Sequence, residues 1–291
     1  MTRITINGLN YHLEECGSGT PVVMLHGFTG STRTWRPLMS TIGQAFRCIA
    51  IDLPGHGQSE APQEADRYRM ERIAVDLTGL LKQLAAAPAH WLGYSMGGRL
   101  ALYIACRHSE LVRSMVLESA SAGLREPSER EARIAQDTAL ANRIENEGIP
   151  RFVDYWQSIP LFDTQKHLPE KAQAAMRQQR LSNSVAGLAN SLRGMGTGAQ
   201  PELWSELGNL AMPVMLIAGE KDAKFVSINR QMAAAIPHAR LEIVAGSGHA
   251  VHLEVSHQYG DLVMRFLTGS SKGSGEYLPE AEEGYEYKRS Q

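Results

Sequence analysis

Residues 93–97, Gly93-Tyr94-Ser95-Met96-Gly97, decide the fold of this chain. They follow the apolar run 89–92 and precede Gly98-Arg99-Leu100-Ala101-Leu102, so a strand, a sharp turn and a helix meet with a serine at the apex. The Gly-x-Ser-x-Gly pattern predicts a nucleophile elbow, in which a serine on a strained turn carries its hydroxyl above the end of a sheet. The glycines on either side prevent clashes where the strand folds back onto the helix.

Short apolar runs on both sides of this turn indicate a sheet. They lie at residues 22–25, 48–51, 91–92, 114–117, 214–217 and 241–244. Between the second and the third, apolar residues recur at helical spacing from Met70 to Leu84, which predicts a helix that packs one face on the sheet. Strands that alternate with helices favour parallel pairing with right-handed crossovers. The expected fold class is therefore α/β, a doubly wound, mainly parallel sheet flanked by helices.

The strand signal disappears between residues 122 and 200, where charged and aromatic residues alternate with leucines in helical patterns. This block predicts a helical lid over the carboxyl ends of the strands, where open parallel sheets bind their ligands. Helices that merely cover the sheet are the alternative. The core then consists of residues 1–121 and 201–267. Residues 268–291 are rich in Gly and Ser and then in Glu and Tyr, without apolar periodicity, which predicts a disordered tail.

Composition excludes several classes of protein. The 291 residues carry a net charge of −2, which gives no basic surplus for binding nucleic acid. No apolar segment is long enough for a membrane span, and the amino terminus lacks the apolar region of a secretory signal. The three cysteines show no C-x-x-C or Cys/His ligand spacing, which favours reduced thiols, a cytoplasmic location and no metal. The oligomeric state is not predicted.

A serine hydroxyl is a poor nucleophile and a poor base at neutral pH, so Ser95 needs a histidine and an acid that orients it. Asp222 and His249 each follow a buried strand, and the order Ser, Asp, His is typical of one large group of sheet enzymes. We therefore predict Ser95, Asp222 and His249 as the catalytic residues. Two competitors remain: Glu118 also ends a strand, and His252 lies three residues beyond His249.

The segment His26-Gly27-Phe28 follows the first apolar run of the sheet. At this place a backbone N–H joins the N–H of the residue after the serine in an oxyanion hole, which predicts Phe28 and Met96 as donors. One such donor contributes ~3 kcal/mol to transition-state stabilisation. We expect His26 to shape the loop, and we expect a structural role for His56 in the turn-rich segment 52–59.

Arg99 lies one helical turn after Ser95, where a cation suits a substrate carboxylate rather than a neutral ester. The lid adds further candidates for the same pocket, namely Arg125, Arg130, Arg133, Trp156, Arg177, Arg180 and Arg193. A solvated helix face is the alternative for each arginine taken alone.

Six stretches resemble one enzyme family, the 2-succinyl-6-hydroxy-2,4-cyclohexadiene-1-carboxylate (SHCHC) synthases of menaquinone biosynthesis. They are residues 23–30, 52–57, 93–99 and 117–124 in the predicted core, and 129–137 and 188–198 in the predicted lid. The resemblance covers about residues 4–267. The core motifs occur throughout the α/β-hydrolase superfamily, whereas the arginine after Gly97-Gly98 and the lid stretches are much more specific.

The resemblance implies an α/β-hydrolase fold and a lyase that eliminates pyruvate from 2-succinyl-5-enolpyruvyl-6-hydroxy-3-cyclohexene-1-carboxylate. It implies a small polycarboxylate substrate and no cofactor. It also implies these roles: Ser95, Asp222 and His249 as the triad, Tyr94 beside the serine, Arg99, Arg133 and Arg180 as carboxylate binders, and Trp156 in the pocket.

Two other functions fit the same residues. A serine carboxylesterase or thioesterase would use the triad for acyl transfer to an acidic substrate, and a non-catalytic ligand-binding protein would keep only the pocket.

Overall fold

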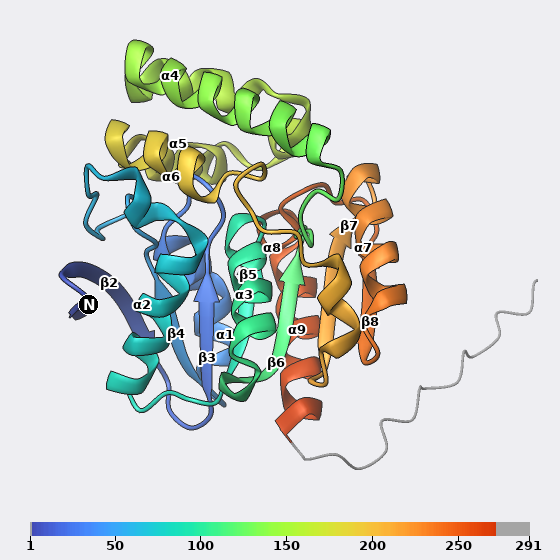
Figure 1. Cartoon of the computed structure of the whole chain (residues 1–291). Helices are drawn as coiled ribbons and strands as arrows, with labels where there is room; N and C mark the ends of the chain where they lie inside the picture. The colour runs from blue at the N-terminus through green and yellow to red at the C-terminus, as the bar shows by residue number, and fades with distance from the viewer. Residues whose placement is uncertain (1, 272–291) are drawn as a thin grey trace, which may run out of the picture.

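One mixed sheet of eight strands forms the centre of the computed structural model, which describes residues 2–271. The order across the sheet is β1-β2-β4-β3-β5-β6-β7-β8 (Figure 1). β2 pairs antiparallel with β1 and β4, and the other pairs are parallel. The strands are β1 (Thr2–Ile6), β2 (Leu9–Cys16), β3 (Pro21–Leu25), β4 (Arg47–Ile51), β5 (Ala89–Tyr94), β6 (Val112–Glu118), β7 (Val214–Gly219) and β8 (Ala239–Val244).

Helices cover both faces of the sheet because the central strands are apolar on both sides. Along β3, Val23 and Leu25 join one apolar core, and Val22 and Met24 join the other. The first core also contains residues of α2 (Met70–Gln83), α3 (Met96–Arg107) and α7 (Ala223–Ala235). The second contains residues of α1 (Arg36–Ile42), α8 (Val251–Glu254) and α9 (Ser256–Ser271). Short 3-10 turns lie at η1 (Thr32–Trp35), η2 (Ala65–Tyr68), η3 (Ser109–Leu111) and η5 (Trp204–Asn209).

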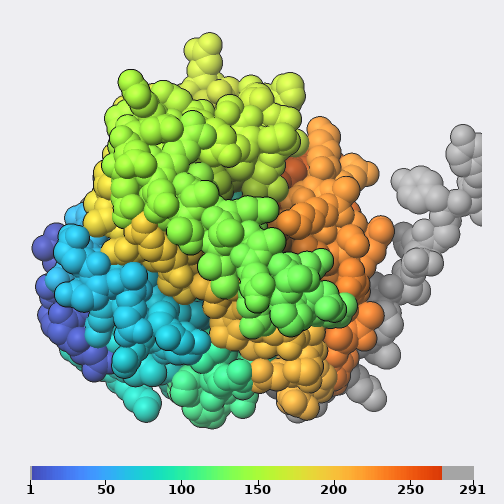
Figure 2. All heavy atoms as spheres, turned by 45° about the horizontal axis from the view of Figure 1, so that its top comes forward, coloured from blue at the N-terminus to red at the C-terminus, as the bar shows by residue number. Residues whose placement is uncertain are grey.

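The chain between β6 and β7 forms a separate layer, which we call the lid (residues 122–200). It holds α4 (Pro127–Ser158), η4 (Pro160–His167), α5 (Glu170–Leu181) and α6 (Val185–Met195), which lie above the carboxyl ends of the strands (Figure 1). Figure 2, with this end turned forward, shows the green and yellow lid atoms spread over it. A third apolar cluster, with Ile144, Phe152 and Leu188 in its centre, holds α4 against α6.

The predicted α/β class is confirmed, and each predicted strand lies within a strand of the structure. β2 was not predicted, because its polar residues hide a strand that is buried at Leu9, Tyr11 and Leu13. The carboxyl end of the core also differs, since α9 continues to Ser271 instead of ending before residue 268. The remainder of the predicted tail, residues 272–291, lies outside the described residues. None of the helices described is sufficiently long and apolar to span a lipid bilayer.

Candidate active site

Ser95 stands on the turn between β5 and α3 with a backbone conformation that few residues adopt, φ 50° and ψ −109°. The turn is too tight for side chains at the neighbouring glycines. A Cβ on Gly93 would lie 2.5 Å from the carbonyl oxygen of Gly97, and a Cβ on Gly97 would lie 2.2 Å from that of Leu25. The strain is held by the packed strand and helix on either side, and it presents the Ser95 hydroxyl to a cavity under the lid.

Two carboxyl-end loops bring an imidazole and a carboxylate to this hydroxyl. His249 Nε2 lies 3.2 Å from Ser95 Oγ, and His249 Nδ1 lies 2.6 Å from Asp222 Oδ2. Because the carboxylate accepts a hydrogen bond from the Nδ1–H group, the proton of the neutral ring stays on Nδ1, and Nε2 keeps a lone pair that faces the serine. The rings of Phe225 and Tyr94 pack against the imidazole at centroid distances of 4.7 and 5.4 Å. The arrangement can take a proton from Ser95 and return it.

Asp222 is also the N-cap of α7. Its Oδ1 accepts a hydrogen bond of 3.2 Å from the Phe225 N–H, while Oδ2 faces the histidine. The helix cap therefore fixes the carboxylate that orients His249.

The competing acid and histidine pair with each other. Glu118 is fully buried, and both of its carboxylate oxygens lie 2.9 Å from His252 Nδ1. The same carboxylate accepts the His252 N–H at 3.1 Å. Glu118 is thus bound to the segment that follows His249 and not to the His249 ring.

His26 fixes the loop that follows β3. Its Nε2 accepts a hydrogen bond of 3.0 Å from the Leu53 N–H, and its Nδ1 donates to the carbonyl of Gly27 at 2.8 Å. Burial lowers the pKa of His26 to about 4, so the ring is neutral at pH 7, as these two bonds require.

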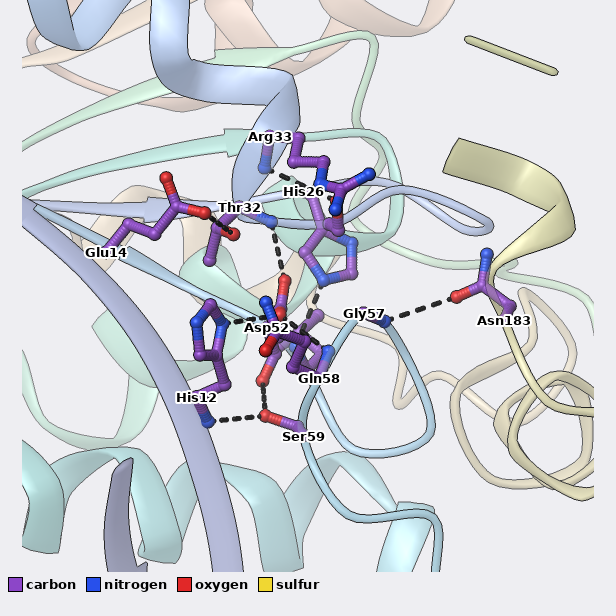
Figure 3. Close-up of polar contacts among 12 residues, drawn as sticks. His12, Glu14, His26, Thr32, Arg33, Asp52, Gly57, Gln58, Ser59 and Asn183 are labelled. Carbon is purple, nitrogen blue, oxygen red and sulfur yellow. Dashed lines mark hydrogen bonds and ion pairs between the residues drawn. The ribbon is translucent and has the colours of Figure 1, made fainter. Parts of the chain in front are cut away.

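Asp52 anchors the far side of the same loop (Figure 3). Its carboxylate accepts hydrogen bonds from the backbone N–H groups of Thr32 at 2.6 Å and Gln58 at 2.8 Å, and from His12 Nδ1 at 2.7 Å. Asn183 of the lid accepts a hydrogen bond from the Gly57 N–H and donates one to the carbonyl of Thr29. The loop that carries Phe28 is therefore held from the core and from the lid.

Phe28 and Met96 both line the cavity beside Ser95. Met96 is the first residue of α3, and the first amides of a helix have no acceptor within it. The two positions fit the predicted oxyanion hole, which stays a prediction.

A cavity of about 610 Å³ lies between the lid and the core, and its size suits a small organic molecule. Aromatic rings of Phe28, Trp156 and Phe162 form one part of its wall. Four cationic residues also line it: Arg99, Arg125, Arg133 and Lys224.

Arg99 is a buried cation without a carboxylate partner. Its side chain is 8% exposed, and Nη1 donates to the neutral Oε1 of Gln200 at 3.4 Å. Gln200 in turn donates to the carbonyl of Ser121 at 2.9 Å. Within residues 2–271 the guanidinium makes no ion pair. Burial and the nearby Arg133 lower the pKa of Arg99 to about 10, so it remains charged at neutral pH and is available to an anion in the cavity.

The chain is similar to known proteins in both sequence and structure. A model of the alpha/beta hydrolase fold matches residues 20–255. A Bacillus subtilis protein, provisionally named a 2-succinyl-6-hydroxy-2,4-cyclohexadiene-1-carboxylate synthase, is 43% identical over 91% of this chain and 97% of its own length. A Serratia proteamaculans protein with that name is 32% identical over 84% of this chain and 92% of its own length.

A solved structure of MenH from S. aureus superposes with a TM-score of 0.86 at 34% identity, over 90% of this chain and 99% of that one. The chain belongs to the α/β-hydrolase fold family and, within it, to the SHCHC synthases. The family resemblance expected from the sequence is therefore confirmed.

The structure places two of the SHCHC synthase lid residues on the cavity wall. Arg133 lines the cavity and binds Asp137 through a 2.8 Å ion pair, so part of its charge is already neutralised. Trp156 packs edge-on against Phe28 at 5.4 Å.

Arg180 lies elsewhere. It lines a separate cavity of about 50 Å³ and donates to Gln165 Oε1 at 3.0 Å. Tyr94 and Phe162 line both cavities and therefore stand between them. Arg99 and Arg133 thus line one cavity and Arg180 lines the other, and their roles as carboxylate binders stay predictions.

The other lid arginines divide between cavity and surface. Arg177 and Arg193 form exposed ion pairs with Asp154 and Glu145, as expected for a solvated helix face. The sequence interpretation did not single out Gln200 or Lys224. Lys224 lies only two residues after Asp222, which was an available signal, whereas nothing local distinguishes Gln200.

Proposed function

We propose that this SHCHC synthase family member eliminates pyruvate from 2-succinyl-5-enolpyruvyl-6-hydroxy-3-cyclohexene-1-carboxylate and forms 2-succinyl-6-hydroxy-2,4-cyclohexadiene-1-carboxylate. The observation that carries the proposal is the buried Arg99, a cation without a carboxylate partner, in the same cavity as the Ser95 hydroxyl. The 43% identity to the Bacillus subtilis protein supports it.

The reaction begins at the proton on ring carbon 2, which is acidic because it lies next to the succinyl ketone. His249 Nε2 accepts the Ser95 proton across 3.2 Å, and the serine oxygen takes the carbon-bound proton. The ketone oxygen becomes an enolate oxygen, which resembles the oxyanion of acyl transfer. The amides of Phe28 and Met96 stabilise this charge in place of water.

The enolate then collapses. Its electron pair forms the bond between ring carbons 2 and 3, the former double bond moves to carbons 4 and 5, and the bond from carbon 5 to the enolpyruvyl oxygen breaks. The His249 imidazolium, held by Asp222, supplies a proton to the leaving group, which becomes pyruvate. The reaction consists only of proton transfers and shifts of electron pairs within the substrate, so it requires neither an added water nor a redox cofactor.

The substrate carries three carboxylates, which is a reason for several cations at this site. Arg99 and Arg133 bind two of them directly in the large cavity, with Trp156 and Tyr94 packed against the ring. Arg180 reaches the third after Tyr94 and Phe162 move apart. A carboxylesterase with this triad would gain little from burying a free guanidinium.

Purified protein mixed with the enolpyruvyl substrate tests the proposal. Pyruvate is followed with a coupled lactate dehydrogenase assay, beside the hydrolysis of short p-nitrophenyl esters. We expect pyruvate release to dominate in the wild type, to be lost in Ser95→Ala and to be strongly reduced in Arg99→Ala. Dominant ester turnover, or a stable acyl-serine trapped from the true substrate, would contradict the lyase activity and indicate an esterase instead.

We further propose that the protein works in the cytoplasm and that a small polycarboxylate is its partner. Its three cysteines are free thiols, which suits a reducing compartment.

A further inference from the structure

The side chain that holds the guanidinium of Arg99 is an amide and not a carboxylate. Gln200 is 1% exposed, and its Oε1 accepts from Arg99 Nη1 at 3.4 Å while its Nε2 donates to the carbonyl of Ser121 at 2.9 Å. A guanidinium can only donate hydrogen bonds, and a carbonyl oxygen can only accept them. An amide satisfies both neighbours at once, because it carries an acceptor and a donor. Gln200 therefore binds the guanidinium without placing a negative charge beside it.

The backbone that carries Gln200 is fixed as well. Its N–H donates to the carbonyl of Gly196, directly after α6, at 3.1 Å. Two residues before Gln200, the Gly198 N–H donates to Asp137 Oδ2 at 3.2 Å. A side chain that is bonded at its end and anchored at its backbone keeps one orientation. Arg99 thus rests against an acceptor whose position is set by the fold.

The carboxylate that acts on Arg99 through space already has partners. Burial and then Arg133 lower the pKa of Arg99 to about 10, and Asp137 opposes them. Asp137 accepts from Arg133 Nε at 2.8 Å on Oδ1 and from the Gly198 N–H on Oδ2. The two arginines of the cavity therefore differ, since Arg133 pairs with a carboxylate and Arg99 with an amide. The charge of Arg99 is the less neutralised of the two and the more available to an anion.

We propose that Gln200 is a positioning residue, which holds Arg99 in the cavity and leaves its positive charge free for a carboxylate of the substrate. The inference rests on the proposed function for the identity of that substrate. A glutamate of the same length would pair with the guanidinium and compete with the ligand. An apolar side chain would leave the guanidinium charged but unrestrained. The neutral amide avoids both losses.

Two readouts test this role. The first is pyruvate release, resolved into kcat and KM. The second is the concentration of a ring carboxylate that protects Ser95 from labelling by a fluorophosphonate, which requires no turnover of the natural substrate. The probes are cyclohex-3-ene-1-carboxylate and its uncharged carboxamide, which have nearly the same shape. Gln200→Glu adds a charge and keeps the size, whereas Gln200→Met removes both hydrogen bonds and adds no charge.

We expect Gln200→Glu to raise KM and to weaken protection by the carboxylate on the order of 10-fold, because the new carboxylate pairs with Arg99. Protection by the carboxamide should not change. Within residues 2–271, Gln200 does not line the cavity, so kcat should stay within about threefold.

Gln200→Met should weaken carboxylate binding less, by about 3- to 5-fold, since it removes a neutral acceptor and leaves the cation free. A purely structural role predicts the opposite order of the two variants. Gln200→Met removes two hydrogen bonds, whereas Gln200→Glu keeps an acceptor for Arg99 and removes only the bond to Ser121.

Gln173→Glu is the matched control. It adds the same charge to the lid, in α5, and Gln173 also donates to main-chain carbonyls, those of Lys166 at 3.1 Å and Leu168 at 2.7 Å. It should leave both readouts unchanged. In an Arg99→Met background, Gln200→Met should have no further effect on either readout, because its effect passes through Arg99. Thermal unfolding of each variant identifies any that fails to fold.

The outcomes separate this role from the proposed function. Wild-type protection by the carboxylate in Gln200→Glu, with pyruvate release intact in the wild type, would overturn the role of Gln200 and leave the proposed function standing. Equal protection of the wild type by the two probes would overturn it too, because the charge of Arg99 would then not be available. Weaker carboxylate protection in Gln200→Glu, in a protein that releases no pyruvate, would support the role of Gln200 and contradict the proposed function.

Discussion

At the scale of single residues, Asp222 divides two tasks between its two oxygens. Oδ2 orients His249, and Oδ1 caps α7 by accepting the Phe225 N–H. The cap restricts the side-chain rotamer before any substrate binds, so the carboxylate meets the imidazole without a further loss of conformational freedom. Arg99 differs from Asp222, since its buried guanidinium makes no ion pair within residues 2–271 and burial lowers its pKa to about 10.

Substituting Asp222 by Asn separates the two tasks. The amide oxygen can still accept from Phe225, but the amide nitrogen cannot accept the His249 Nδ1 proton. We expect kcat to fall by roughly 10²–10⁴-fold, as when a triad aspartate loses its charge, while the helix cap remains. Asp222→Ala should in addition lose about 1 kcal/mol of stability from the cap. Steady-state pyruvate release and urea unfolding measure the two effects, and equal stability of the two variants would contradict the second role.

Replacing Arg99 by Met should separate function from stability. The variant loses charge-assisted hydrogen bonds to a substrate carboxylate, worth about 1.5–3 kcal/mol, so kcat/KM should fall roughly 10- to 150-fold. Thermal unfolding should occur at the same or a higher temperature, because a buried cation that lacks an anion is replaced by an apolar side chain of similar length. A clear drop in unfolding temperature would show that the guanidinium stabilises the fold in the absence of substrate.

At the scale of elements, the lid owes its shape to one break in α4. Gly148 has φ 76° and ψ 170°, and Pro150 follows it, so the helical segment changes direction there. This backbone conformation is almost exclusive to glycine. After the break, Phe152 packs in the lid core and Trp156 reaches the cavity wall. The break thus sets which residues of α4 face the cavity.

Gly148→Ala should therefore destabilise the protein by about 1–3 kcal/mol and lower pyruvate release, because the lid must strain or straighten. The matched control is Gly79→Ala, in α2, where a new Cβ meets Ile6 at an ordinary 3.5 Å. That substitution should stabilise the protein by about 0.5–1 kcal/mol and leave activity unchanged. Urea unfolding of both variants checks the opposite signs, and stabilisation by Gly148→Ala would refute the account of the break.

At the scale of the whole molecule, the loops at the carboxyl edge of the sheet are joined by buried neutral histidines. The rings of His26 and His56 pack in a tilted arrangement at a centroid distance of 5.1 Å, between the loop after β3 and the loop after β4. Burial lowers the pKa of His26 to about 4, and burial together with His26 lowers that of His56 to about 3. Protonation of either ring requires this edge of the protein to open.

The fold should consequently lose stability in weak acid. Below pH ~6.5 the unfolded chain binds protons at these histidines that the folded chain does not, so the free energy of unfolding falls as the pH falls. For His26 the loss between pH ~6.5 and its folded pKa of about 4 is roughly 3 kcal/mol. Urea unfolding at a series of pH values should show a shallower slope for His26→Gln than for the wild type. The exposed His257→Gln controls for the substitution itself, and an unchanged slope in His26→Gln would count against the explanation.

The strands of the parallel sheet, the lid, the serine turn and the family could be predicted from local patterns in the sequence. Apolar runs and helical spacing placed the strands of the parallel sheet and the lid, because backbone geometry repeats over a few residues. The elbow was predictable since only glycine fits at positions 93 and 97 beside Ser95. The lid stretches and the arginine after Gly98 were specific enough to indicate the SHCHC synthase family.

Only the tertiary structure decided which groups meet. Asp222 and Glu118 both follow strands at the same sheet edge, and the folded chain pairs the first with His249 and the second with His252. Within residues 2–271, folding also leaves Arg99 without an ion pair to a carboxylate, and it puts Arg180 on a second cavity that Tyr94 and Phe162 separate from the first. These outcomes depend on side-chain packing between segments far apart in the chain, which no local pattern records.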